Sequence, residues 1–318
     1  KTAAQLGLSA NATLLYDASI AALESDQAFG AAVGNIDTVA GVVSLYEQML
    51  PDLSSARENQ SIRMQDVASG MISDRLDMMR TAGQGAGDGG GKYYERYRRA
   101  GFWLQEGVSQ ETSDTASNGA QAYDGTMYTI AGGYDARDKK GDVWGASLSY
   151  AAMSYSAGTA MADNLTQSTV GQVYYSMNRN SLFWDTIGSL GWNSYDSERI
   201  VTAGTVVRTA DANWNGYQAG VTSQVGFSGV FGPITVRPSV GASYLFLNQG
   251  GKPETNGHFN SSGATFALNG AELDKSTPFF GAGLSFVGGY SRLSLEYTGQ
   301  LGSKFTSHQG VATASLMF

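Results

Sequence analysis

The sequence predicts an all-β transmembrane antiparallel β-barrel that follows an N-terminal α-helical region. Three observations predict it: residue types alternate with a period of two after residue 100, the connections alternate between short and long, and the composition is poor in charge. Charged residues make up 15% of the chain, against about 25% in an ordinary soluble domain. A membrane barrel can have this composition because its strands face lipid on one side and water on the other.

The helical region precedes the strands. Residues 17–33 and 36–50 are rich in alanine and leucine, and Pro51 is expected to end the second of these helices. Another helix is predicted near residues 54–80, because its apolar residues recur at steps of three and four. Its apolar stripe is narrow, so the helix is not built for a dry core. Because a glycine tether and then the predicted barrel follow it, a position in the barrel lumen is favoured, with a packed helical bundle as the alternative. The residues expected on the lumenal helix are Met64, Met71, Arg75 and Met79.

The alternation after residue 100 predicts the strands. Near residues 142–156, Trp144, Leu148 and Tyr150 share one face, while Gly145 and Ser147 share the other. An apolar face and a small or polar face are typical of a membrane barrel. A soluble β-sandwich also alternates, but its solvent face usually carries more Lys and Glu. Ten segments are predicted, near residues 101–110, 124–137, 142–156, 166–178, 181–195, 212–227, 233–247, 278–287, 291–301 and 306–318.

The connections between these segments fall into two groups. The short ones lie near residues 137–141, 178–180, 228–233 and 287–290. The mostly longer ones lie near residues 111–123, 157–164, 193–212 and 247–277. Short turns on one rim and long loops on the other are the asymmetry of outer-membrane barrels. A sandwich has no physical reason to sort its loops in this way.

Polar residues on the inner side of the strands are predicted to face the lumen. These side chains are expected to contact the lumenal helix, to pair with one another, or to be solvated, and the sequence leaves all three alternatives open. These residues are Gln218, Gln224, Arg237, Arg292 and Glu296.

A glycine-rich stretch suggests the domain organisation. Residues 81–91 are expected to form a tether between the helical region, residues 1–80, and the barrel, residues 92–318. A continuous helix of ~80 residues would span ~120 Å, whereas a bilayer core is ~30 Å thick. The helical part before residue 55 is therefore expected outside the pore, as a passenger remnant, a periplasmic element or a stalk.

Most catalytic and binding chemistries find little support. The chain has no cysteine, which excludes disulfides and thiolate metal sites. Its histidines, His258 and His308, fall in predicted surface loops. The Gly85–Gly90 stretch fits a dinucleotide motif, but no strand precedes it, so a tether is the better interpretation. The net charge of −8 argues against a nucleic-acid partner.

We expect no enzyme activity, no metal and no cofactor. We also expect no membrane-spanning helix, and the opening at Lys1 is consistent with a mature product.

Several ordered motifs resemble the autotransporter β-domain. Phe102-Trp-Leu opens the first strand, Gly132-Gly-Tyr-Asp135 lies in the second, and Trp144-Gly-Ala-Ser-Leu-Ser-Tyr150 forms the third. Arg292-Leu-Ser-Leu-Glu-Tyr297 precedes the last strand, Gly310–Phe318. That last strand is similar to the signal that the barrel-assembly machinery recognises, through Phe318, Leu316 and Ala314. The resemblance covers roughly residues 55–318.

The resemblance implies a function and a location. Family members have a twelve-stranded barrel with a helix through the lumen, linked to a passenger on the N-terminal side. The expected function is that of a type V secretion translocator, which anchors in the Gram-negative outer membrane and exports or displays a passenger that precedes Lys1. Only ten segments are visible here, and the family hairpin ahead of Arg237-Pro238 is not among them. No self-cleavage motif is assigned. The alternative is a stand-alone outer-membrane barrel that acts as an adhesin or surface protein through its long loops.

Overall fold

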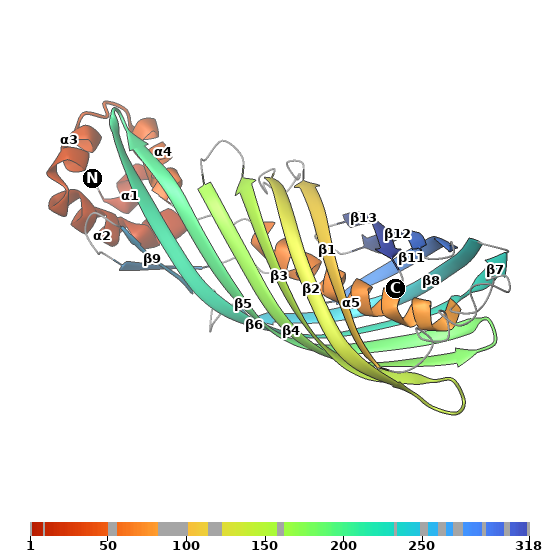
Figure 1. The fold of residues 1–318 in the computed structure, drawn as a ribbon. Helices are drawn as coiled ribbons and strands as arrows, with labels where there is room; N and C mark the ends of the chain where they lie inside the picture. The colour runs from red at the N-terminus through yellow and green to blue at the C-terminus, as the bar shows by residue number, and fades with distance from the viewer. Residues whose placement is uncertain are drawn as a thin grey trace.

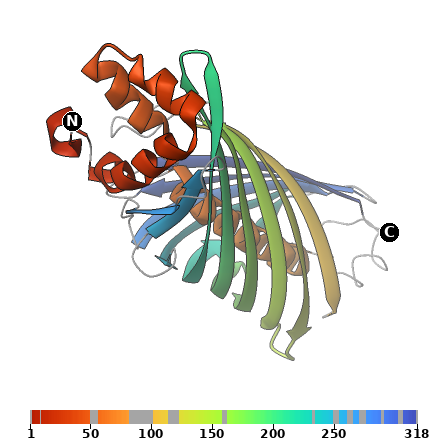
Figure 2. The same cartoon turned by 90° about the vertical axis from the view of Figure 1, so that its left-hand side faces the viewer.

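A computed structural model describes residues 2–8, 10–49, 56–81, 101–113, 123–157, 162–231, 234–248, 254–259, 265–269, 276–287, 291–301 and 306–316. A strongly curved antiparallel sheet wraps around one long helix, and a group of shorter helices lies at one end of the sheet (Figure 1). The second view shows these shorter helices gathered around the tip of the hairpin formed by β5 (Leu182–Ala203) and β6 (Val206–Phe227) (Figure 2).

The N-terminal helices are α1 (Ala3–Leu6), α2 (Ala10–Ser25), α3 (Gln27–Gly34) and α4 (Val39–Met49). The predicted helix over residues 17–33 is wrong in its continuity, since the chain breaks at Asp26. The Asp26 carboxylate accepts a hydrogen bond from the backbone N–H of Phe29 at 3.0 Å and caps α3. Such a cap satisfies a free amide at a helix start and favours a new helix there. Pro51 lies outside the described residues.

The sheet contains thirteen strands. The main path runs in the order β1-β2-β3-β4-β5-β6-β8-β11-β12-β13, and all described pairings are antiparallel. These ten strands correspond to the ten predicted segments. Their bounds are β1 (Phe102–Ser113), β2 (Tyr123–Arg137), β3 (Val143–Ala157), β4 (Ala162–Arg179), β5 (Leu182–Ala203), β6 (Val206–Phe227), β8 (Ile234–Asn248), β11 (Ser276–Val287), β12 (Ser291–Leu301) and β13 (Thr306–Leu316).

The predicted long connection over residues 193–212 is wrong. Strands β5 and β6 both extend into this region, and each is 22 residues long. Their pairing continues to Ala203 and Val206. The reversal uses Gly204, whose φ of 61° lies in the left-handed region that glycine adopts without a steric penalty. Polar residues such as Asn193 and Asp196 suggested a loop, but they sit on an extended hairpin instead.

The predicted connection over residues 247–277 is also more ordered than expected. It contains β9 (Glu254–Phe259) and β10 (Thr265–Asn269), which pair with each other. Strand β9 also pairs with β6 through residues 210–212. The extra hairpin therefore follows the Arg237-Pro238 strand and does not precede it. The predicted short turn over residues 228–233 contains a further short strand, β7 (Gly229–Phe231), paired with β8.

The outer face of the sheet carries an apolar band. On β5 the exposed aromatic side chains are Trp184 and Trp192, and on β6 they are Tyr217 and Phe227. Trp192 pairs with Tyr217 across the ladder, and Leu182 pairs with Phe227. From Trp184 to Trp192 and from Tyr217 to Phe227, the band matches the ~9–11 residues that a tilted strand needs to cross a bilayer. Among the described helices, none has the combined length and apolar character that a spanning helix needs.

Candidate functional site

The long helix α5 (Ala56–Thr81) lies along the concave face of the sheet (Figures 1 and 2). Near its start, Thr166 donates to Gln60 at 2.9 Å, and Ser61 is 2.7 Å from the Tyr195 hydroxyl. Near its end, Arg137 donates to the carbonyl of Met79 at 3.5 Å. The helix therefore starts at the rim of the long connections and ends at the rim of the short turns.

Apolar contacts seat α5 on strands β2 to β5. In the first half, Met64 packs with Met127 and Met153. In the second half, Ile72, Leu76 and Met79 pack with Val143, Tyr174 and Ile187. The expectation that this narrow apolar stripe would not form a buried core is therefore wrong along this wall. The four residues expected on the lumenal helix, Met64, Met71, Arg75 and Met79, are all buried.

Polar side chains fill the remaining contacts of α5. Gln65 donates to Ser189 at 2.9 Å and accepts from Gln218 at 3.3 Å. Gln172 donates to Ser69 at 3.3 Å, and Gln224 donates to Ser73 at 3.3 Å. Buried polar groups are costly unless they are hydrogen-bonded, so the polar inner strand positions and the polar residues of α5 stabilise one another.

A buried ion pair holds the second half of the helix. Arg75 makes two parallel hydrogen bonds to Asp135 on β2, at 2.8 and 3.1 Å. The two side chains are only 6% and 0% exposed. The backbone N–H of Gly101 also donates to Asp135, at 3.2 Å. A paired guanidinium and carboxylate with this geometry give both strength and a fixed orientation.

A second buried ion pair lies one turn further along. Arg80 donates to Asp185 on β5 at 2.7 and 3.1 Å, and to Ser176 at 3.0 Å. The guanidinium also lies over the ring of Phe183, 4.2 Å from its centroid. Two such pairs fix both the rotation and the depth of α5 against the sheet.

The residues predicted to face the lumen fall into two groups. Gln218, Gln224 and Arg237 all contact α5; Arg237 donates to the carbonyl of Ser73 at 3.5 Å, and its Nε lies 3.8 Å from Asp77. Arg292 and Glu296 lie on β12, opposite Val287 and Gly283 of β11, and their side chains are outside the described part. Of the predicted terminal signal, Ala314 and Leu316 lie on β13, whereas Phe318 falls beyond the described residues.

Sequence reasoning missed both acidic partners, Asp135 and Asp185. Their position in the strands could have indicated them. Each carboxylate lies inside a strand, on the same face as the residues two positions away, which face α5. A charge there must be paired or solvated. In the part of the chain that the structure describes, no three His, Asp or Glu side chains gather as a metal site.

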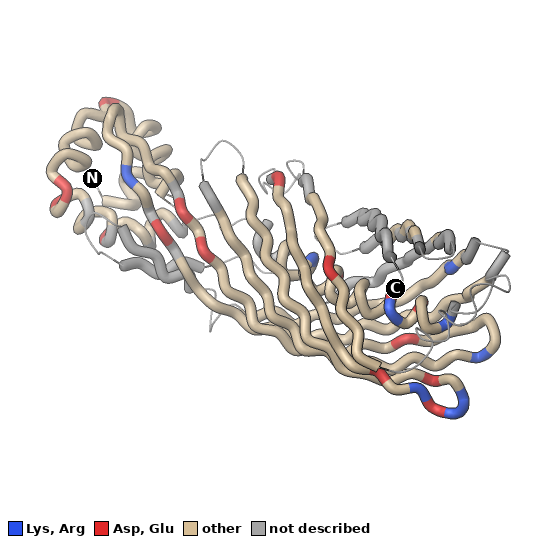
Figure 3. The backbone as a smooth tube through the Cα atoms, in the orientation of Figure 1, with Lys and Arg blue, Asp and Glu red and all other residues tan. Residues whose placement is uncertain are grey.

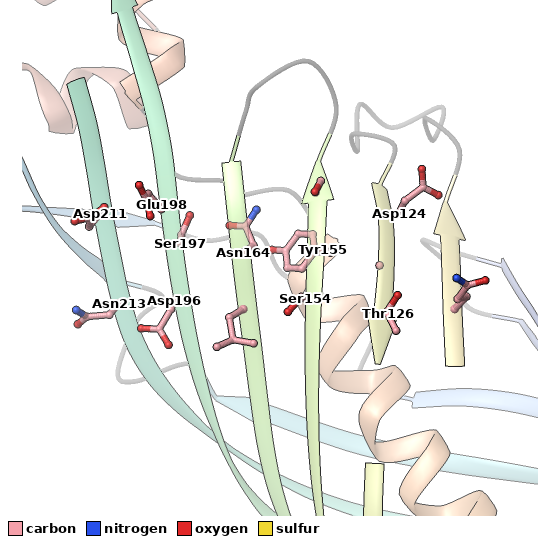
Figure 4. Close-up of a pocket in the computed structure, with 14 residues that line it drawn as sticks. Asp124, Thr126, Ser154, Tyr155, Asn164, Asp196, Ser197, Glu198, Asp211 and Asn213 are labelled. Atoms are coloured by element: carbon pink, nitrogen blue, oxygen red, sulfur yellow. The ribbon is translucent and has the colours of Figure 1, made fainter. Parts of the chain in front are cut away.

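An open hollow lies at the rim of the long connections. Its volume is about 960 Å³, and it is lined mostly by polar residues from β1 to β6. Four of the lining residues are carboxylates: Asp124, Asp196, Glu198 and Asp211 (Figure 4). The turn between β2 and β3, at the opposite end of the sheet, carries both basic and acidic residues (Figure 3).

An ion pair ties two of the short turns together. Arg179, at the end of β4, donates to Asp142, just before β3, with 3.0 Å between Nη2 and Oδ2. Its hydrogen bonds hold the pKa of Asp142 at about 2, while burial acts in the opposite direction. Asp142 also accepts from the backbone N–H of Asn178 at 3.2 Å. The pair therefore joins the β2–β3 and β4–β5 turns.

This lowered pKa predicts a pH dependence. The stabilising contribution is complete above the pKa of an unfolded aspartate, about 4, and is lost as the pH falls through about 2. We expect Asp142→Asn to lower the urea midpoint in detergent by a constant amount above about pH 4, and the difference to close between about pH 4 and 2. An unchanged difference at pH 2 would contradict this assignment.

Comparisons with known proteins agree with this architecture. The family model described as "Autotransporter beta-domain" matches residues 102–316. The translocator domain of autotransporter NalP from Neisseria meningitidis is 15% identical, with a TM-score of 0.50 over 69% of this chain and 76% of that one. The β-domain of the Bordetella autotransporter BrkA is 17% identical, with a TM-score of 0.45 over 68% and 84%. The transport unit of AIDA-I from Escherichia coli is 11% identical, with a TM-score of 0.30 over 77% and 98%. No curated protein matches the chain.

The family match and the curved antiparallel sheet identify an outer-membrane translocator of type V secretion. The chain belongs to the autotransporter β-domain family. It resides in the outer membrane of a Gram-negative bacterium and exports a passenger. The family match also decides between the two functions that the sequence left open, in favour of the translocator over a stand-alone barrel. The chain is thus a transport structure.

Proposed function

We propose that α5 remains in the pore after export and closes it as a plug. The observation that carries the proposal is the pair of buried bidentate contacts, Arg75 with Asp135 and Arg80 with Asp185. Ion pairs of this kind are costly to break, because separation leaves an uncompensated buried charge. A segment that only passed through the pore would have no need for partners fixed along the wall.

The direction of α5 supports export of everything that precedes it. In outer-membrane barrels the short turns face the periplasm and the long connections face outwards. Helix α5 ends at the rim with the β2–β3 turn, and its start lies near the rim of the long connections, beside Tyr195. Helices α1 to α4 would then lie on the cell surface, which favours a passenger-side stalk over a periplasmic element. In this proposal residues 1–80 form the exported and lumenal part, residues 81–91 the tether, and residues 92–318 the barrel.

Two partners follow from the outer surface of the sheet. The apolar band bounded by Trp192 and Tyr217 on one side and by Trp184 and Phe227 on the other would face lipid, with aromatic rings at both interfaces. The final strand, ending with Leu316 and Phe318, would be read by the barrel-assembly machinery. The barrel itself would do its work by anchoring, export and closure without catalysing a reaction.

Cysteine labelling tests the plug, because the chain has no cysteine of its own. Ser69 on α5 is buried, and Ser154 at the mouth is exposed. With a membrane-impermeant maleimide, Ser154→Cys should label on intact cells, whereas Ser69→Cys should stay unlabelled.

Permeabilised envelopes provide the control for access from the periplasm. Ser69→Cys should remain protected there and should label only after heat denaturation. If it labels as fast as Ser154→Cys in either preparation, α5 does not occupy a closed lumen.

A further inference from the structure

The N-terminal helices do not form a core of their own but share one with the β5–β6 hairpin. Buried residues of α2, α3 and α4 pack in one cluster with Val201 and Ala203 of β5. Both hairpin residues are 1% exposed, and Val206 of β6 packs against the same cluster. The helical members are Ala12, Leu15, Phe29, Leu45, Tyr46 and Met49. The hairpin therefore supplies part of the hydrophobic interior of the helical unit.

Polar contacts fix the orientation of this interface. Arg208 of β6 makes two hydrogen bonds to the Asp26 carboxylate, one of them 3.1 Å from Nη2 to Oδ1. The hydrogen bonds from Arg208 lower the pKa of Asp26 below its usual value. On the other side of the hairpin tip, the backbone N–H of Thr202 donates to Gln48 of α4 at 3.3 Å.

The docking surface lies on the part of the hairpin beyond the apolar band. The outermost exposed aromatic residues of the two strands are Trp192 and Tyr217, and the strands continue past them to Ala203 and Val206. Strand β9 extends the sheet there by pairing with residues 210–212 of β6. These contacts are therefore well separated from the contacts of α5 with the concave face.

We infer that the hairpin tip is a non-covalent docking site for the exported helical unit α1–α4, strong enough to retain it when the chain is cut between Met49 and Ala56. A passenger that precedes the helices then stays on the cell surface after such a cut. The retention needs only the hairpin interface, so it holds whether or not α5 closes the pore.

The test uses the full chain with an N-terminal epitope and a spaced protease site inserted between Met49 and Ala56, in a version that denaturing gels show to be fully cut. Antibody binding to intact, uncut cells first establishes that the epitope is outside. After the cut, most of the epitope should remain with the sedimented cells. Prompt release of the epitope from the unmutated chain, or an epitope that the antibody cannot reach, would overturn the inference.

Variants of the hairpin make the test specific. Val201→Asp introduces a carboxylate into the shared core and should speed release by about 30-fold or more. Val207→Asp is the matched control, because this neighbouring side chain is 52% exposed, and it should retain the epitope. Arg208→Ala removes a partly exposed ion pair and should speed release by about two- to five-fold.

Folding of the barrel is checked for each variant by the mobility shift between unboiled and boiled samples. Equal release from Val201→Asp and Val207→Asp would show that this hairpin face does not hold the helices. If Val201→Asp fails to insert, the comparison of Arg208→Ala with the unmutated chain decides, and equal release rates would then refute the docking site.

Discussion

Replacement of Asp135 by alanine is expected to destabilise the packing of α5 against the sheet by about 3–5 kcal/mol. This is the usual cost of leaving a buried charge unpaired. Arg75 would lose both of its hydrogen bonds to the carboxylate, and the amide of Gly101 would lose its acceptor as well. The change should appear as a lower urea midpoint of the detergent-solubilised protein and as increased uptake of large antibiotics by cells.

Asp124→Ala provides the control for this experiment. Asp124 lies on the same strand, β2, but is exposed at the mouth. Substitution of an exposed residue usually changes stability by less than about 0.5 kcal/mol. If Asp135→Ala behaves like Asp124→Ala in both assays, the ion pair contributes little to the position of the helix.

Leu76→Ala is expected to have the second largest effect, a destabilisation of about 2–5 kcal/mol from lost burial and the cavity left behind. Leu76 has no exposed surface and packs in the cluster that includes Val143, Tyr174 and Ile187. Since α5 contributes one side of this cluster and the sheet the other, the cavity opens between them. Urea unfolding followed by tryptophan fluorescence measures the loss, because Trp103 packs against the same cluster.

The matched comparison is Leu76→Met, which nearly conserves the volume and should cost less than about 1.5 kcal/mol. If both substitutions lower the free energy of unfolding by a similar amount, the loss does not come from the cavity. No measurable loss for Leu76→Ala would contradict the dry contact between α5 and the wall.

The strands could be predicted from the sequence because their period is local. Alternation such as Trp144, Leu148 and Tyr150 against Gly145 and Ser147 is dictated by which face each residue occupies. The ten segments of the main path follow from this rule. The position of α5 also follows from its composition, since a helix with a narrow apolar stripe and many polar residues matches a polar inner face better than an apolar core.

Other features depend on contacts that are distant in the sequence. The parts of β5 and β6 between residues 195 and 212 were missed because polar residues there resemble a loop. Their ladder and the helical unit packed on Val201 and Ala203 hold them extended. The pairing of Arg75 with Asp135 spans 60 positions, and no local pattern specifies the partner. The rule that a carboxylate inside a strand needs compensation could have drawn attention to Asp135, but it does not name the partner.

The position of α5 explains how polar residues of the inner wall can be buried where the helix contacts the sheet. Gln172, Ser189 and Gln218 would require water in an empty barrel, but here they bond to Gln65 and Ser69 of the helix. Their hydrogen bonds to α5 replace those that solvent would provide. The same wall would be wet, and would conduct ions, if the helix left.

Ion conductance in planar lipid bilayers tests this central claim most directly. The full chain is compared with a chain that begins at residue 82, after both show the heat-dependent mobility shift of a folded barrel. We predict that the full chain leaves the bilayer nearly insulating and that the shortened chain gives large stepwise currents. Equal currents from the two proteins, whether both are large or both absent, would contradict the account of α5 as the plug of this translocator.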